Sequence, residues 1–375
     1  MSSFDQQSPC DHNYFMPAEW HRHSKCWMHW PYRQDNWRLD AKPAQNAFAN
    51  VARAISKHEP VFVGASACCL ESAREHLDSI GNVHVVLIES DDSWMRDTGP
   101  TFVISNGNKE GNELSEDSVR GIDWFFNSWG NLMTYEHDNL VAGKICEMEM
   151  IKSYSTHEPL FILEGGSIHV DGEGTCMVTE ECLLNSNRNS HLTKEEIEKK
   201  LKSHLNVLTV IWLSKGLTGD EDTNGHIDNL CCFYAPGKVL LSWTDDERDE
   251  FYPVCRTALM ELRSSPDARG RVLEVIKLPI PPAMHYSEEE VGTLSIPESG
   301  ALRQVGERLA ASYVNFYITN GSVVVPAFGH TEADDRAASI IQSCFPEREV
   351  VQIPDAKEIL LGGGNIHCIT QQQPC

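Results

Sequence analysis

The sequence is poor in basic residues. It has 31 Lys and Arg against 55 Asp and Glu among 375 residues, which gives a formal net charge of −24 at pH 7. Nucleic acids and anionic membrane surfaces would repel such a chain, so neither is an expected partner. Hydrophobic residues make up 41% and charged residues 23%, which are ordinary values for a folded globular protein and exclude general disorder.

Long apolar runs are also missing. The first 15 residues, MSSFDQQSPCDHNYF, are polar and have neither the basic start nor the apolar centre of a signal peptide. The longest strongly apolar stretches, such as Val207–Leu213, are far too short to cross a bilayer. We therefore expect a cytoplasmic protein with no membrane partner.

The 13 cysteines include no CxxC pair, and no group of Cys and His has the spacing of a zinc site. His21-Arg22-His23 comes nearest, and it is more typical of a surface loop. Because no secretory signal is present, most cysteines are expected to be free thiols buried as small apolar residues. The sequence therefore predicts no metal site.

Strand-like and helix-like segments alternate along the whole chain. Runs rich in Val, Ile, Phe and Tyr that end in Gly, Asn, Asp or Pro predict strands at 60–64, 83–89, 101–105, 159–163, 207–213, 238–243, 272–279, 313–318 and 322–326. Helical spacing predicts helices over 44–55, 245–264 and 334–345, and Thr193 with Glu196 forms a capping box before a further helix. This alternation indicates the α/β class.

An internal similarity indicates repeated units. Leu163–Val170 (LEGGSIHV) and Leu361–Cys368 (LGGGNIHC) align without gaps and share five of eight residues. Self-similarity of this kind is typical of supersecondary units repeated around an axis, although two glycine-rich turns can also be alike by chance. No Pro, Ser or Gly-rich linker divides the chain, so we predict a single domain over residues 1–375.

The segment Asp91–Pro100 lies between two predicted strands, where active-site loops are commonly found. It places acidic side chains, including Asp97, beside Trp94. Such a group can hold a planar cation by hydrogen bonds and stacking. A solvated acidic loop is the alternative for this segment alone.

Two further segments combine acids, glycine and histidine. Glu164 follows an apolar run directly, and the two glycines after it permit a close approach of backbone or ligand. The stretch lacks the spacing and the Lys-Ser/Thr of a phosphate loop. His226 and Asp228 are two residues apart, so in an extended chain they would share a face, with the acidic run Asp220–Asp222 just upstream. A core histidine with satisfied hydrogen bonds is the alternative for His226.

Cys368 follows a triple-glycine turn, Gly362–Gly364, at the expected start of a strand. This position makes it accessible to a substrate. Any one of 13 cysteines is more often structural, but the position separates Cys368 from Cys231 and Cys232, which lie inside an apolar run.

Together these segments offer a cysteine, a histidine and several carboxylates. A cysteine nucleophile with a histidine acid/base suits acyl transfer or amidine hydrolysis. Acyl transfer develops negative charge, which nearby carboxylates would oppose, whereas a guanidinium or amidinium is bound by carboxylates through paired, charge-assisted hydrogen bonds. The residues therefore indicate a planar, cationic substrate with C–N bonds.

The motifs resemble those of the agmatine deiminases (agmatine iminohydrolases). The segments that carry the resemblance occur in the family's order and are Met16–Trp20, Trp94–Pro100, Glu164–His169, Asn224–Asn229 and Gly362–Cys368. The similarity extends from Met16 to about Pro374, and finer details such as Gly121–Trp124 look most like the plant branch. It implies a pentein fold, a five-bladed αβ propeller with pseudo-fivefold symmetry and a central active site.

The resemblance also implies an activity. The expected reaction is hydrolysis of agmatine to N-carbamoylputrescine and ammonia, a step in putrescine and polyamine biosynthesis from arginine. No cofactor and no metal are implied, and a homodimer is expected.

The family's roles transfer to matching residues. Cys368 matches the nucleophile that forms a covalent thiouronium, and His226 matches the general acid/base. Asp97 and Asp228 match the carboxylates that bind the guanidinium N–H groups, and Glu164 matches the acid that orients His226. Trp94 is expected to pack on the substrate methylenes. The distal ammonium is assigned to Asp220, with Glu221 and Asp222 as alternatives in the same acidic run.

Two alternatives remain at this point. The chain could act on free arginine or peptidyl-arginine, but these need a partner for a carboxylate or open access for a peptide, and Arg96 is the only arginine in the motif segments. Some proteins of this fold are non-catalytic binding proteins, including a ribosome-associated translation factor. The complete set of predicted catalytic residues argues against that reading.

Overall fold

The computed structural model describes residues 7–106, 118–295 and 303–375. Within them the chain forms five small sheets. Two sheets have four strands: the order β17-β2-β3-β4 comprises Thr370–Pro374, His23–His29, Val61–Ala65 and Val83–Leu87, and the order β1-β5-β6-β7 comprises Tyr14–Phe15, Thr101–Ser105, Val119–Asp123 and Ser153–Ser155. Three sheets have three strands, with the orders β10-β9-β8 (Thr209–Leu213, Thr175–Thr179, His169–Val170), β11-β12-β13 (Cys231–Ala235, Lys238–Trp243, Glu274–Pro279) and β14-β15-β16 (Tyr317–Ile318, Ser322–Pro326, Glu349–Ile353).

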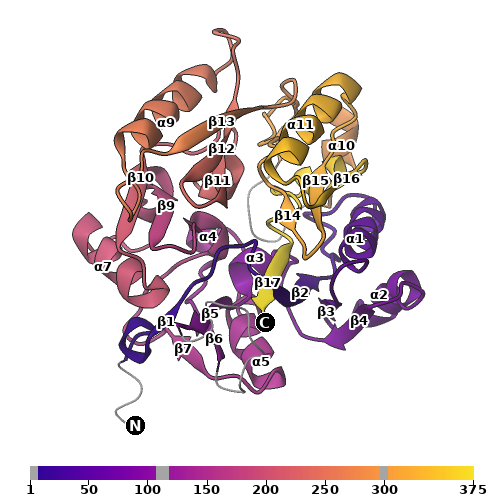
Figure 1. Cartoon of the computed structure of the whole chain (residues 1–375). Helices are drawn as coiled ribbons and strands as arrows, with labels where there is room; N and C mark the ends of the chain where they lie inside the picture. Colours follow the sequence, from indigo (N-terminus) through magenta and orange to yellow (C-terminus); the bar gives the residue numbers. More distant parts are fainter. Residues whose placement is uncertain (1–6, 107–117, 296–302) are drawn as a thin grey trace.

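The same connection recurs in all five sheets. An antiparallel pair of strands is followed by a helix and then by a further strand that pairs in parallel, as in β11, β12, α9 (Tyr252–Ser264) and β13. The equivalent helices of the other sheets are α1, α5, α7 and α11 (Lys42–Ile55, Val141–Met148, Lys194–Leu205 and Thr331–Cys344). Figure 1 shows the sheets arranged around a common centre with these helices on the outside. The predicted α/β class and five-bladed arrangement are confirmed.

The ends of the chain close this ring. The last strand, β17, pairs antiparallel with β2, near the start of the chain. Its three glutamines are buried, and Gln373 accepts a 2.8 Å hydrogen bond from the indole Nε1 of Trp27. The strand begins at Thr370, two residues after Cys368, where its start was expected, and its polar composition gives no hydrophobicity pattern.

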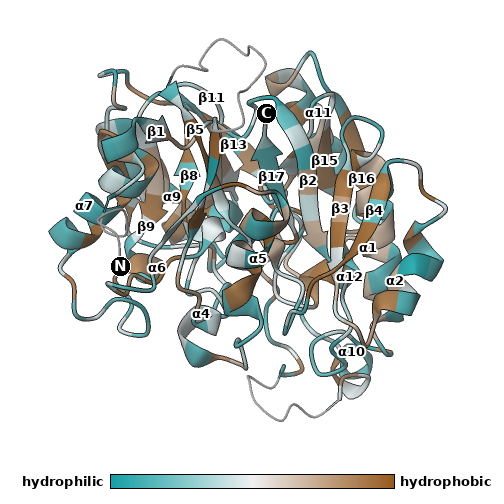
Figure 2. Cartoon of the chain, turned by 90° about the horizontal axis from the view of Figure 1, so that it is seen from below, coloured by the Kyte–Doolittle hydropathy of each residue, from teal (hydrophilic) through white to brown (hydrophobic). Residues whose placement is uncertain are grey.

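The core lies between each sheet and its helix. In α1, the side chains of Phe48, Val51, Ala52 and Ile55 are buried, as their spacing predicts. Figure 2 shows apolar residues along β3 and β9 and polar residues over much of α7. The capping box of Thr193 and Glu196 is formed at the start of α7. Among the described residues, no helix is both long enough and apolar enough to cross a membrane.

Two strand predictions were wrong. Residues 159–163 make only an isolated bridge, between Ile162 and Phe125, and the run 313–318 forms a strand only at its end, Tyr317–Ile318. In the first segment only Phe161, Ile162 and Leu163 are buried, whereas Leu160 is exposed; in the second the apolar side chains are buried without a continuous ladder.

Candidate active site

Four segments singled out by the sequence meet near the centre of the ring. They are the short helix α3 (Met95–Thr98), the turn Gly165–Ser167, the short helix α8 (Ile227–Leu230) and the turn that precedes Cys368. Figure 1 places α3 close to the start of β17. The backbone amide of Arg96 donates to the carbonyl of Cys368 at 3.0 Å, which ties α3 to the cysteine.

Three predicted site residues converge on Gly166. A Cβ atom at this position would lie 2.6 Å from His226 Nδ1 and 3.0 Å from both Asp228 Oδ2 and Asp97 Oδ1. The Gly166 amide donates to Asp97 Oδ1 at 2.8 Å. Only a residue without a side chain leaves these groups so close together, which explains the glycine turn after Glu164.

Cys368 lies beside this group. Its Sγ is 3.5 Å from Asp228 Oδ2 and 3.1 Å from Asn315 Nδ2. A Cβ on Gly364 would come within 2.9 Å of the sulfur, so the glycine also keeps space open at the thiol. Burial raises the pKa of the Cys368 thiol well above its usual value, and the negative charges of Asp228 and Asp97 raise it further. The free protein therefore holds Cys368 as a thiol at neutral pH.

A cavity opens onto the cysteine. It has a volume of about 340 Å³, part of which is open solvent. Its walls combine aromatic and acidic side chains with one arginine; they are Trp94, Asp97, Trp129, Leu132, Met133, Asp222, Thr223, Arg303, Gly362, Gly363, Gly364 and Cys368. His226 and Asp228 do not line the cavity but lie behind Asp97 and Cys368. The cavity thus offers an aromatic channel that ends at the nucleophile and at carboxylates.

His226 is held without a hydrogen bond to either ring nitrogen among the described residues. Its Nδ1 is 3.9 Å from Asp97 Oδ2. Burial disfavours the charged ring, but Asp97, the Cys182 thiol and Asp228 outweigh it, so the pKa of His226 is raised well above its usual value. The ring is therefore protonated at neutral pH, as a general acid requires.

The prediction that an extended backbone brings His226 and Asp228 together is wrong. The segment is not extended: His226 precedes α8 with φ −55° and ψ 146°, and Asp228 lies inside the helix. The turn from this extended residue into the helix directs both side chains toward Gly166. The two residues meet as predicted, by a different local geometry.

Glu164 lies next to His226, but among the described residues no hydrogen bond joins the two. Its Oε1 instead accepts a 2.5 Å hydrogen bond from Arg188 Nε, and its Oε2 has no partner. Ligand atoms of Glu164, Cys182 and His226 all lie within 4.8 Å of one another. Glu164 is thus placed to stabilise a charged His226, while its orienting role remains a prediction.

The surroundings of Asp97 affect its pKa differently from those of Asp228. Its Oδ2 accepts a 2.8 Å hydrogen bond from the indole of Trp129. Burial raises the pKa of Asp97, and His226 offsets this only in part. A buried carboxylate of this kind gains from a cationic ligand, because the ligand's positive charge stabilises its ionised form.

Asp220 and Asp222 belong to the same acidic run but have different surroundings. Asp220 does not line the cavity: its Oδ1 accepts from Thr223 Oγ1 at 2.7 Å, and its Oδ2 accepts from the His226 amide at 3.1 Å and Asn229 Nδ2 at 3.0 Å. Burial raises the pKa of Asp220 to about 6. Asp222, in contrast, lies on the cavity wall, where Arg303 Nη1 contacts its Oδ2 at 2.5 Å. Of the two, only Asp222 therefore reaches the cavity, where it is paired with Arg303.

Two groups of possible metal ligands occur among the described residues, namely Glu19 with His169 and His367, and Glu164 with Cys182 and His226. In the first group, both imidazole rings already interact with the carboxylate of Glu19. In the second, the Arg188 guanidinium bound to Glu164 would repel a cation. Neither group presents a free set of donors, so the absence of a functional metal remains our prediction.

The protonated state of Cys368 can be tested by alkylation. Only a thiolate reacts, so we expect a neutral haloacetamide to label Cys368 slowly at neutral pH and about tenfold faster per pH unit as the pH rises toward its raised pKa. A cationic haloacetamidine should react much faster at neutral pH, because Asp97 and Asp228 attract it. Peptide mapping with both reagents measures this. Equal rates for the two reagents, or labelling of Cys231 first, would contradict the assignment.

Several residues of this site were not predicted from the sequence. Asn315, Trp129, Arg188, Arg303 and His367 all contact predicted site residues. Asn315 had a usable signal, since it is a polar residue inside an apolar run. His367 lies in the motif Gly362–Cys368 and in the internal repeat, so it too had a signal. Trp129, Arg188 and Arg303 lie outside the motifs and reach the site only through the ring arrangement.

Known proteins resemble this chain over almost its whole length. A family described as Porphyromonas-type peptidyl-arginine deiminase matches residues 15–374. The agmatine deiminase of Ectopseudomonas mendocina (strain ymp) is 53% identical over 372 residues, covering 98% of this chain and 97% of its own length. That of Medicago truncatula is 51% identical over 374 residues, covering 98% of both chains.

A solved structure of an agmatine deiminase, from Enterococcus faecalis, superposes with a TM-score of 0.91 at 41% identity. It covers 100% of this chain and 99% of its own. The bacterial and the plant relative are about equally similar to this chain, so its resemblance to the plant branch remains a prediction.

Proposed function

This chain belongs to the agmatine deiminase family, and we propose that it hydrolyses agmatine to N-carbamoylputrescine and ammonia through a covalent intermediate on Cys368. The product retains the four-carbon amine of putrescine, so the reaction belongs to the route from arginine to putrescine and the polyamines. The observation that carries the proposal is that Cys368 and Asp97 lie at the end of one cavity, with His226 and Asp228 directly behind them. Their chemistry fits a guanidinium: two carboxylates to bind it, a thiol to attack it and an acid to protonate its leaving group.

The first half of the reaction forms the adduct. The guanidinium donates N–H bonds to Asp97 and to Asp228, whose Oδ1 has no partner among the described residues and can accept one. As the cation binds, its positive charge favours the thiolate of Cys368; the thiol proton is released to solvent, and the sulfur attacks the central carbon and gives a tetrahedral adduct. His226 donates its proton to the departing nitrogen, ammonia leaves, and a thiouronium remains on the sulfur.

The second half releases the product. His226, now neutral, takes a proton from a water molecule that attacks the same carbon. The tetrahedral adduct collapses, the C–S bond breaks, and the ureido product leaves. The hydroxyl proton of the collapsing adduct passes to the departing sulfur and restores the thiol, and the proton that His226 took from water restores its charged ring, so the histidine acts once as acid and once as base.

Three substrates test the proposal directly. Purified protein should produce ammonia and a ureido product from agmatine, at a much higher kcat/KM than from free arginine or a peptidyl-arginine. Comparable turnover of arginine would show that the distal end of the cavity does not select a bare amine. Turnover of the peptide alone would assign the chain the activity named in the family description, and no turnover of any of the three would overturn the proposal.

Specificity for agmatine is expected to depend on Asp222. Agmatine and arginine both carry an ammonium at the end away from the guanidinium, and arginine adds a carboxylate beside it. Two unit charges ~4 Å apart interact by about 4 kcal/mol at an effective dielectric of 20. Arg303 already pairs with Asp222 and donates to the Gly362 carbonyl at 2.8 Å, so part of this attraction is already used. A remaining third of it corresponds to about tenfold in kcat/KM.

We therefore expect Asp222→Asn to lower kcat/KM about tenfold for agmatine and much less for an alkylguanidine without the amine. Asp220→Asn is the matched control, because Asp220 does not line the cavity and bonds to Thr223, the His226 amide and Asn229. It should lower activity on both substrates alike. Steady-state kinetics of both variants on both substrates measure the difference, and the reverse pattern would restore Asp220 as the ammonium partner.

We also propose that the protein is a cytoplasmic homodimer. Its acidic charge and the resemblance support this. Sedimentation velocity on the purified chain, and fractionation of cells that express it, are the corresponding tests.

A further inference from the structure

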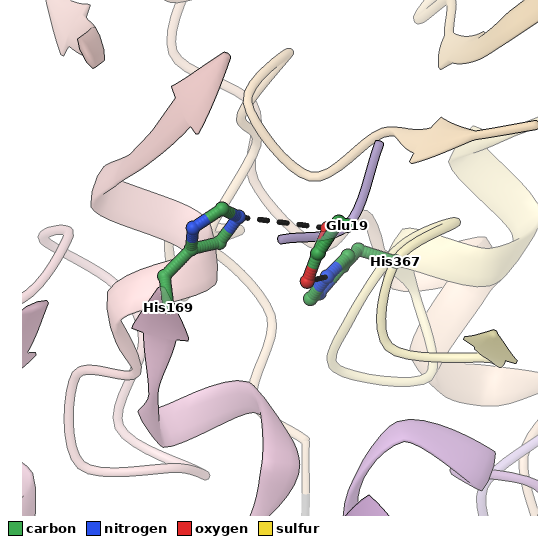
Figure 3. A group of neighbouring side chains, drawn as sticks. All are labelled: Glu19, His169 and His367. Carbon is green, nitrogen blue, oxygen red and sulfur yellow. Dashed lines mark hydrogen bonds and ion pairs between the residues drawn. The ribbon is translucent and has the colours of Figure 1, made fainter. Parts of the chain in front are cut away.

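A buried carboxylate joins the two histidines of the internal repeat. Glu19 lies between His169 and His367, which occupy the same position in the two similar segments (Figure 3). Glu19 Oε1 is 2.8 Å from His367 Nε2, and Glu19 Oε2 is 3.5 Å from His169 Nε2. All three side chains are buried. The mechanism above uses none of them.

Only one of the two histidines reaches the active site. His367 Nδ1 is 2.9 Å from Asp228 Oδ2, and the same oxygen is 3.5 Å from Cys368 Sγ. A continuous line of contacts therefore runs from Glu19 through His367 and Asp228 to the nucleophile. His169 turns its Nδ1 elsewhere, toward the Phe233 amide, which donates to it at 3.3 Å.

Proton positions follow from these partners. Because His169 Nδ1 accepts a hydrogen bond, its Nε2 carries the proton and donates to Glu19. Arg96 Nη1 is a further cation, 3.6 Å from Glu19 Oε1. Glu19 thus faces three donors, which stabilises its ionised form. His367 has a carboxylate oxygen at each ring nitrogen, and ionised carboxylates only accept, so both of its nitrogens carry protons.

We propose that Glu19 and His367 are positioning residues for guanidinium binding: Glu19 holds His367 as an imidazolium, and His367 fixes Asp228 as an oriented carboxylate whose second oxygen faces the substrate. The inference rests on the proposed function, because it concerns the same bound guanidinium. A neutral His367 could satisfy both contacts only if Glu19 or Asp228 were protonated, and a protonated Asp228 would bind a cation poorly.

Comparison of the two binding carboxylates supports this role. Asp97 and Asp228 are both buried, but only Asp228 has an imidazolium at hydrogen-bond distance. Burial alone would raise both pKa values; His367 reverses this for Asp228, whose pKa is lowered, while the pKa of Asp97 is raised. Burial and Arg96 oppose the charge of His367, yet Glu19 and Asp228 prevail and raise its pKa. The pKa shifts of His367 and Asp228 thus point to the same interaction between the two residues.

The charged and titratable neighbours come from several elements. Those facing His367 are Glu19 before β2, Arg96 on α3, His169 on β8 and Asp228 on α8. Those facing Asp228 are His367, Cys368, His226, Arg96, Asp97 and Asp220. Among them, His367 is the cation that directly hydrogen-bonds the Asp228 carboxylate.

The pH dependence of kcat/KM tests the proposal. His367→Asn keeps a neutral donor near Asp228 and removes the positive charge, and Glu19→Gln removes the carboxylate that sustains it. In both variants Asp228 should protonate more easily as the pH falls. We expect the acid limb of kcat/KM for agmatine to move up by about one pH unit, so that the loss is about tenfold at pH values below the limb and disappears as the pH rises above it.

His169→Gln is the matched control. It is the equivalent buried histidine, it contacts the same carboxylate, and glutamine keeps a donor toward Glu19, but it does not touch Asp228. Its acid limb should stay where it is in the unmodified protein, whatever its melting temperature. Unmoved acid limbs in both His367→Asn and Glu19→Gln would overturn the proposal and leave agmatine hydrolysis standing, as would an equal shift in His169→Gln.

A second measurement does not depend on activity. In protein labelled with ¹⁵N-histidine, His367, assigned by its loss in His367→Asn, should show both ring nitrogens protonated at about pH 8, where an ordinary histidine with a pKa of about 6.5 is neutral. This result would support the charge assignment even if the protein turned over no guanidine. A neutral ring at that pH would overturn it, whatever the substrate proves to be.

Discussion

Replacing Cys368 by alanine is expected to abolish turnover of agmatine while leaving binding measurable. No other thiol among the described residues lies on the cavity wall, so no substitute nucleophile is available there. Asp97 and Asp228, which bind the guanidinium, are unchanged in this variant. Steady-state product assays should show no activity above background, and calorimetric titration with agmatine should still give a saturable signal.

Cys231→Ala is the matched control for this prediction. Cys231 is equally buried, but it lies in β11 and packs in an apolar cluster away from the thiol of Cys368. Its loss should lower the free energy of unfolding without removing activity. Turnover by Cys368→Ala, or loss of turnover in Cys231→Ala with a normal fold, would assign the chemistry to another group.

Replacing His226 by asparagine is expected to slow both half-reactions. A positioned general acid or base commonly contributes ~10²–10⁴ in rate, and His226 serves in both roles here. Asparagine keeps a polar side chain of similar length but cannot exchange a proton near neutral pH. Steady-state kcat for agmatine should therefore fall by roughly that factor, while the unfolding midpoint remains close to that of the unmodified protein.

The pH profile separates this effect from a structural one. In the unmodified protein His226 acts as an acid only while protonated, and Asp97, the Cys182 thiol and Asp228 keep its pKa high despite its burial. Activity should therefore persist on the alkaline side well above the usual histidine pKa and fall as His226 loses its proton. The variant should lack this alkaline limb. Full activity in His226→Asn would remove the histidine from the mechanism.

Much of the site could be predicted because its residues lie in compact motifs. Asp97, Glu164, His226, Asp228 and Cys368 each lie in a short motif that contains glycine, and the structure brings all five to one place. The fold was accessible for a related reason: the repeat of Leu163–Val170 in Leu361–Cys368 signals repeated units, and the resemblance implied five of them. Short motifs and internal repeats can both be recognised in a sequence alone.

The remainder depends on distances that a sequence does not contain. Asp220 and Asp222 are two residues apart in one acidic run, yet one is used by its own loop and the other faces the cavity with Arg303, 81 residues away. Strand β17 is polar in sequence but buried in the structure, where it pairs with β2 and Gln373 accepts a hydrogen bond from Trp27, near the other end of the chain. Glu19 and His367, separated by 348 residues, meet only because the ring closes.

The central claim is that Cys368 carries the substrate as a covalent thiouronium. The most direct measurement is rapid acid quench of His226→Asn with agmatine, followed by peptide mapping and mass spectrometry, in parallel with the unmodified protein. We predict a mass increase equal to agmatine less ammonia on the peptide that contains Cys368, accumulating in the variant when its second half-reaction is the slower one. An adduct on a different cysteine, or product formation by the unmodified protein with no adduct on Cys368 at any quench time in either protein, would contradict the claim.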